Sequence, residues 1–130
     1  MKKSSFLTGI TALALVVAFS VVLAAAQQKD ASYSGTLVDS KCYLAHGQTG
    51  NDHGPNKACG TLCLKGGTPG GLLTSDKKFY ALLAPSIALA PYVGQEIRVS
   101  GSMVNGSINV SKVEVNQNGS WQEVKLSPTA

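Results

Sequence analysis

The chain lacks the sequence motifs of several common cofactor-binding sites and enzymes. It has no Cys-x-x-Cys-His sequence for covalent haem attachment, and its Cys-x-x-x-Cys pair differs from the thioredoxin-type motif. Gly-x-Ser-x-Gly, P-loop and dinucleotide-binding patterns are missing, and no acid–base or nucleophile–base pair is visible. The sequence therefore predicts no haem, no nucleotide cofactor and no enzymatic activity.

The chain also lacks a basic run interleaved with aromatic side chains. Its formal charge of +4 comes from 11 Lys and Arg residues against 7 Asp and Glu residues, spread along the sequence. Nucleic-acid-binding proteins usually gather such charge on one face or in one segment. We expect no nucleic-acid partner.

The N-terminus has the layout of a secretory signal peptide. Lys2 and Lys3 precede an apolar run, residues 6 to 26, that ends on three alanines. We predict cleavage after Ala26 and export to the periplasm or beyond, with membrane contact only through this segment before cleavage. The alternative is a retained anchor, because the run is just long enough to span a bilayer. No cysteine follows the run, which argues against a lipid-anchored start.

Residues 27 to 130 have the size of one ordinary domain. Five segments have strand-like patterns, several of them with alternating apolar and polar residues, and turn residues separate them. They are YSGTLVD (33–39), GLLTSDKKFYALL (71–83, two strands around a polar tip), QEIRVSGSMV (95–104), SINVSKVEV (107–115) and WQEVKL (121–126).

The connections between these segments suggest how they pair. Asn105-Gly106 predicts a two-residue hairpin turn, and a change of apolar phase predicts a bulge near Ser111 and Lys112. PSIALAPY (85–92) has prolines near both ends, so we expect a short helical connector there. The chain is thus predicted to be mostly β, a small antiparallel OB-like barrel with a Cys/His-containing helical insertion, residues 39 to 70, between the first and second strands.

All three cysteines and both histidines lie between residues 42 and 63. Cysteines in an oxidising compartment pair, bind metal or become oxidised, and three cannot all pair within one chain. Pro55 and Gly66 predict the two ends of a helix between them. On such a helix Cys59 and Cys63 project from the same face.

Three interpretations of this cluster remain open. Cys42 can form a disulfide with Cys59 or Cys63, which leaves one free thiol in a purely structural or interaction module. The three cysteines with His46 or His53 can instead bind Zn²⁺ or Cu(I), whose preferences suit sulfur and imidazole ligands. One exposed cysteine can take part in thiol exchange. The predicted function is an exported binding or metal-handling module whose partner is a metal ion or an unidentified protein.

Asp39 lies beside the cluster. It can orient a ligand or accept a hydrogen bond from Lys41, although an Asp at this position more often ends a strand.

Three stretches also carry a resemblance: GTLVDSKCYLAHG, ACGTLCLKGGTPGGLLT and LAPYVGQEIRVSGSM. Together they resemble a family of small exported bacterial domains with no established biochemical function. Its members have a Cys-Tyr-Leu element, a Cys-x-x-x-Cys pair, a Gly-x-Pro turn and an OB-like C-terminal half. The resemblance covers roughly residues 33 to 115. It implies an exported single domain and no particular activity.

Overall fold

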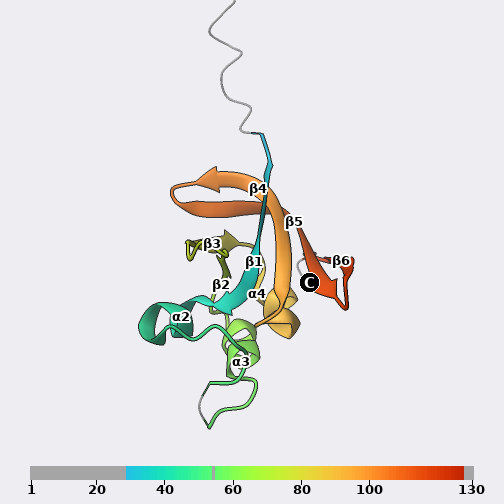
Figure 1. Cartoon of the computed structure of the whole chain (residues 1–130). Helices are drawn as coiled ribbons and strands as arrows, with labels where there is room; N and C mark the ends of the chain where they lie inside the picture. The colour runs from blue at the N-terminus through green and yellow to red at the C-terminus, as the bar shows by residue number, and fades with distance from the viewer. Residues whose placement is uncertain (1–28, 54, 128–130) are drawn as a thin grey trace, which may run out of the picture.

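The computed structural model describes residues 29–53 and 55–127, and the predicted signal peptide, residues 1 to 26, lies outside them. The described part is mostly antiparallel β with short helices (Figure 1). None of its helices has the length and apolar character needed to cross a membrane. The elements are β1 (Ala31–Asp39), α2 (Ser40–His46), α3 (Cys59–Lys65), β2 (Gly70–Leu73), β3 (Phe79–Leu83), α4 (Ser86–Leu89), the 3-10 helix η2 (Ala90–Tyr92), β4 (Glu96–Val104), β5 (Ser107–Gln117) and β6 (Ser120–Val124).

The six strands form one sheet in the order β3-β2-β1-β4-β5-β6. Neighbours in this order pair antiparallel. The end of β3 also pairs with β5 in parallel, at Leu82 with Ile108 and Leu83 with Asn109. This pairing completes a circuit of β1, β2, β3, β5 and β4, and β6 is attached to the outside of that circuit through β5.

Strand pairing confirms the hairpins expected from the sequence. The segment 71–83 folds back as β2 and β3, and Asn105 and Gly106 turn between β4 and β5 with φ of 48° and 77°. The predicted bulge is also present, since Ser100 pairs with Lys112 while Gly101 pairs with Val110. A Cβ on Gly101 would lie 2.2 Å from the carbonyl oxygen of Asn109, so the bulge brings the two backbones too close for any other residue.

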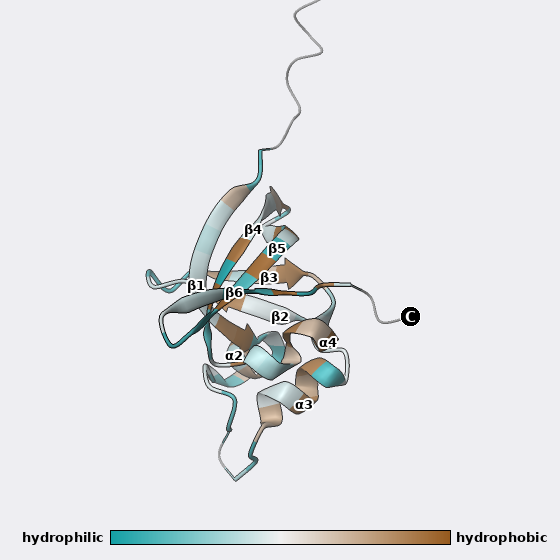
Figure 2. Ribbon diagram, turned by 90° about the vertical axis from the view of Figure 1, so that its right-hand side faces the viewer, coloured by the Kyte–Doolittle hydropathy of each residue, from teal (hydrophilic) through white to brown (hydrophobic). Residues whose placement is uncertain are grey.

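The hydrophobic core extends from inside the strands to the helices at one end of them. Figure 2 shows α2, α3 and α4 together at that end, as Figure 1 does from another side. Leu64 of α3 and Leu89 of α4 are fully buried in the same cluster as the strand residues. The other members of the cluster are Leu37, Leu72, Leu82, Ala90, Val93, Ile97, Val99, Ile108, Val113, Val115 and Val124.

The insertion after β1 differs from the expectation of one helix starting near Pro55. It contains two helices, and the first, α2, was not predicted. The second begins at Cys59, four residues late, because Ala58 adopts a left-handed conformation with φ of 54° that interrupts helix geometry. Its end before Gly66 is as predicted.

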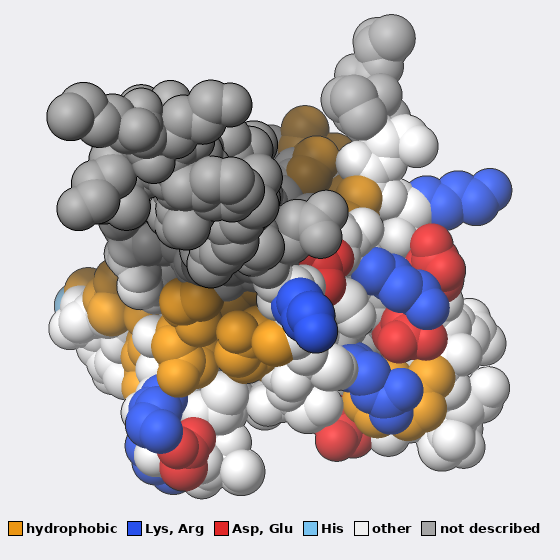
Figure 3. Space-filling model, turned by 90° about the horizontal axis from the view of Figure 1, so that it is seen from above, with side chains coloured by type: hydrophobic (Ala, Val, Ile, Leu, Met, Phe, Trp, Pro, Cys, Tyr) orange, Lys and Arg blue, Asp and Glu red, His pale blue; other side chains and the backbone are white. Residues whose placement is uncertain are grey.

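Charged side chains of both signs are intermixed on the face shown in Figure 3. Ion pairs join Arg98 and Lys112 to Glu114, and Lys112 to Glu123, across β4, β5 and β6. The Arg98 guanidinium also lies 4.2 Å from the centre of the Trp121 ring. These basic groups are thus engaged with neighbouring side chains rather than gathered into a basic patch.

Candidate metal centre

Asp39 fixes the first cysteine. It is the last residue of β1 and the N-cap of α2, where its Oδ1 accepts hydrogen bonds from the backbone N–H groups of Lys41 (2.9 Å) and Cys42 (3.4 Å). Gly47 ends the helix with φ of 69°. Tyr43 stacks on Phe79 of β3 with ring centres 5.2 Å apart. Cys42 therefore lies in the first turn of a helix that is held to the sheet at its start and along one side.

The other two cysteines lie on α3. Its N-cap residue, Ala58, has no side chain to cap the helix, and Asn51 from the preceding loop takes that role. Asn51 Oδ1 accepts from the Thr61 N–H at 2.8 Å, and its carbonyl accepts from the Gly60 N–H at 3.0 Å. A Cβ on Gly60 would meet Val93 at 2.5 Å, so α3 packs closely on the segment after η2.

His53 comes from the loop between the two helices, and backbone contacts hold it in place. Its N–H and carbonyl both pair with Asn56 at 3.0 Å. The ring is nine-tenths buried, with Nε2 2.7 Å from the carbonyl oxygen of Gly50. Because a carbonyl only accepts, Nε2 carries the proton and Nδ1 keeps its lone pair. Nδ1 is buried and has no hydrogen-bond partner among the described residues.

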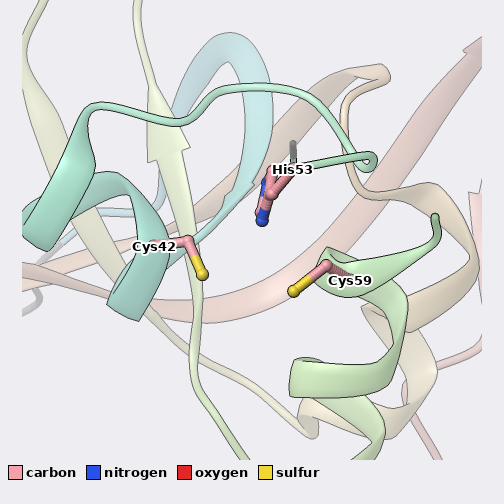
Figure 4. Close-up of side chains that lie close together, drawn as sticks. All are labelled: Cys42, His53 and Cys59. Atoms are coloured by element: carbon pink, nitrogen blue, oxygen red, sulfur yellow. The ribbon is translucent and has the colours of Figure 1, made fainter. Parts of the chain in front are cut away.

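These side chains converge on the Cys42 sulfur. Cys42, His53 and Cys59 each offer a ligand atom, and the three atoms lie within 4.8 Å of one another. Figure 4 shows the three side chains reaching toward one another from α2, the loop and the start of α3. Asp39, Cys42 and Cys63 form a second group within the same distance. The sulfurs of both α3 cysteines are thus close to that of Cys42.

The surroundings keep two of these thiols protonated. Hydrogen bonding to the Asp39 carboxylate, followed by burial and by the charges of Asp39 and Cys59, raises the pKa of Cys63 to about 12. Burial, with Asp39 next, also raises the pKa of Cys42 above its usual value. Both effects come from crowding acidic groups together in a partly desolvated place. A metal ion would reverse them, since thiolates and carboxylates are favourable beside a cation.

Asp39 itself is almost completely buried, with 1% of its surface exposed. Its Oδ2 has no hydrogen-bond partner among the described residues. No ion pair found within residues 29–53 and 55–127 includes it. A buried carboxylate without a countercharge is costly even when it accepts hydrogen bonds, and such groups are normally paired with a cation or bound to a metal.

The structure brings together four of the five candidate ligands expected from the sequence: Cys42, His53, Cys59 and Cys63. The fifth, His46, is exposed in the last turn of α2 and belongs to neither group. No disulfide joins the three cysteines, all of which are free. Asp39, a member of the second group, was not among the predicted ligands, although its place directly before Ser-Lys-Cys indicates an N-cap beside the cluster.

No protein-family model, curated protein or solved structure shows significant similarity to the chain. The arrangement of these side chains therefore carries the functional argument.

Proposed function

We propose that this protein is an exported domain that binds a transition-metal ion, Zn²⁺ or Cu(I), at Cys42, His53 and Cys59, with Cys63 and Asp39 adjacent. The observation that carries the proposal is the His53 ring. Its Nε2 donates to the carbonyl oxygen of Gly50, its Nδ1 is buried without a partner among the described residues, and a ring nitrogen lies within 4.8 Å of the sulfurs of Cys42 and Cys59. A carbonyl that accepts from one ring nitrogen while the other faces a metal is the usual way of orienting a histidine ligand.

The donor set suits a soft or borderline metal. Thiolate sulfur and imidazole nitrogen are the preferred ligands of Zn²⁺ and are also good ligands for Cu(I). Calcium and magnesium prefer oxygen ligands, of which this cluster offers one carboxylate. A metal-handling or metal-stabilised binding module fits this set.

The barrel supports the rest of the proposal. A circuit of five strands closed by a parallel β3–β5 pairing, with a helical connector before β4, is consistent with an OB-like barrel. The Cys/His insertion then lies at one end of a rigid scaffold, where binding sites are commonly built. The layout of residues 1 to 26 and the resemblance to exported bacterial domains both support delivery of this domain outside the cytoplasm.

Metal binding can be tested on the protein purified under reducing conditions. Zn²⁺ is titrated against a chromophoric chelator, and Cu(I) is titrated separately. We expect binding at no less than one equivalent, together with thiols that resist a thiol reagent until a stronger chelator is added. His53→Ala should weaken binding, whereas His46→Ala is the matched control and should leave it unchanged. Failure of the reduced protein to bind either ion would refute the proposal.

A second candidate function follows from the position of Cys42, whose sulfur lies near those of both Cys59 and Cys63. Either pair can form a disulfide that joins α2 to α3 within the insertion, with the third cysteine as a free thiol in a structural or interaction module. Intact mass of the protein isolated without reductant distinguishes the two. The disulfide form is lighter by two hydrogens and shows one reactive thiol after unfolding, whereas the metal form shows three thiols released by chelator.

A further inference from the structure

The ligand atoms of the cluster form two groups that share one atom. One group is Cys42, His53 and Cys59, and the other is Asp39, Cys42 and Cys63. Within each group the atoms lie within 4.8 Å of one another. Two sulfur ligands of one Zn²⁺ ion are separated by no more than about 4.6 Å, twice the usual bond length, so each group matches one ion with little movement.

Each group also includes a residue with a buried polar atom that has no partner among the described residues. In the first group this atom is Nδ1 of His53, and in the second it is Oδ2 of Asp39. Both side chains are nine-tenths or more buried. Leaving a buried polar atom unpaired costs about 1–3 kcal/mol, and more when the group is charged. One ion bound in the first group gives His53 a partner but leaves Oδ2 of Asp39 without one.

The charges lead to the same conclusion. With both groups filled, Cys42, Cys59 and Cys63 are thiolates, and Asp39 adds a fourth negative charge. One Zn²⁺ ion in the first group is balanced by the thiolates of Cys42 and Cys59 alone. Asp39 is then left without a countercharge, since the ion pairs of residues 29–53 and 55–127 bring no Lys or Arg to it. Two Zn²⁺ ions balance all four negative charges.

We propose that the cluster binds two Zn²⁺ ions bridged by the Cys42 thiolate, one held by His53 and Cys59 and the other by Asp39 and Cys63. This inference rests on the proposed metal-binding function. Four Zn–S bonds replace three S–H bonds, because the Cys42 sulfur binds both ions, and the three protons leave to solvent. No oxidant or reductant is involved.

The test is the number of Zn²⁺ ions that the reduced protein binds. Zn²⁺ is added in steps, and the bound ions are counted by native mass spectrometry and by competition with a chromophoric chelator. We expect two equivalents. Asp39→Asn should bind one, because asparagine remains a good N-cap for α2 but no longer supplies an anionic ligand. His53→Ala should also bind one, and Cys42→Ser should lose both ions or bind them far more weakly.

Loss of one ion should leave the other in place. In Asp39→Asn and His53→Ala the affinity for the remaining ion should fall by no more than about 100-fold, the range seen when an outer-shell partner is removed. His46→Ala, on the same insertion but outside both groups, should keep two equivalents. Far-UV circular dichroism of each metal-free variant checks that a lost equivalent does not reflect unfolding.

Cobalt tests the bridge directly. If Cys42 joins the two sites, a second equivalent of Co²⁺ should weaken the electron paramagnetic resonance signal of the first, because a shared thiolate couples the two spins. Two uncoupled ions would overturn the bridge. A single equivalent in the unmodified protein would overturn the two-ion inference and leave the proposed function standing, whereas no binding at all would overturn both.

Discussion

Leu64 offers a test of whether α3, the helix that carries Cys59 and Cys63, is part of the core. Its side chain is fully buried, although the residue lies in the insertion rather than in the sheet. A Cβ placed on Gly70 would lie 3.1 to 3.7 Å from the side chains of Leu89, Leu37 and Leu64, so these three leucines meet over one glycine of β2. Truncating Leu64 to alanine would leave a cavity at the junction of α3, α4, β1 and β2.

The expected cost can be worked out from this environment. Fully burying a leucine side chain contributes about 1.5–3 kcal/mol, and the cavity left by truncation raises the total loss to about 2–5 kcal/mol. On one side the cavity is lined by Gly70 and backbone atoms, which cannot move in to fill it. We therefore expect a loss of unfolding free energy in the upper half of that range. Leu62→Ala is the matched control on the same helix. Leu62 is 63% exposed, and its truncation should change the free energy of unfolding by no more than about 0.5 kcal/mol.

Urea denaturation of the metal-free, reduced variants, followed by circular dichroism, measures both values. The slope with denaturant should stay constant, which would show that stability alone has changed. If Leu64→Ala is no more destabilising than Leu62→Ala, then α3 is not packed as described, and the cluster would depend on metal for its order.

Four further outcomes follow from the structure. Gly101→Ala should destabilise the fold by about 1–3 kcal/mol, since its Cβ would lie 2.2 Å from the carbonyl oxygen of Asn109, whereas Gly66→Ala, with its nearest atoms at 3.4 Å, should be nearly neutral in the same urea assay. In the metal-free protein Cys63 keeps its proton up to about pH 12, while the unfolded chain releases it near the usual value of 9.0, so the free energy of unfolding should fall as pH rises through that window. Cys63→Ala should remove this part of the pH dependence, and an unchanged profile would show that another group is responsible. Asn51→Ala should lower the free energy of unfolding by about 0.5–2 kcal/mol, because α3 loses its cap. It should also weaken Zn²⁺ binding, because Cys59 is the first residue of that helix. The intact mass of the protein recovered from the periplasm should match a chain that begins at Gln27 or within a few residues of it. A mass that matches a chain still carrying residues 1 to 26 would favour the anchor interpretation.

The strands could be predicted from the sequence because their signals are local. Alternating apolar residues, the Asn105-Gly106 turn and the phase change at Ser111 each act over a few residues, and all appear in the structure as expected. The closure of the sheet through β3 and β5 is different. It depends on Leu82 and Ile108, which are far apart in the sequence, and no local pattern specifies that contact.

The helices of the insertion could be predicted only in part, because some of the contacts that define them come from residues far apart in the sequence. The start of α3 is set by the left-handed conformation of Ala58 and by Asn51, whose side chain accepts from the Thr61 N–H ten residues along the chain, so Pro55 was a misleading signal. Both ends of α2 could have been predicted, since Asp39 is the N-cap before the helix and Gly47 is the C-cap after it. Choosing between His46 and His53 required the tertiary structure, because only the folded loop shows which ring is buried beside sulfur.

The circuit of strands also affects how the protein behaves in a crowded compartment. Each of its five strands is paired on both sides along at least part of its length, which leaves β6 as the described strand with a partner on one side only. That strand is short, and Glu123 and Lys125 mark its exposed end. Short, charged edges discourage the strand-to-strand addition from which aggregates grow. Any change that separates β3 from β5 would create two new edges at once, so the few residues of that parallel contact protect solubility as much as shape.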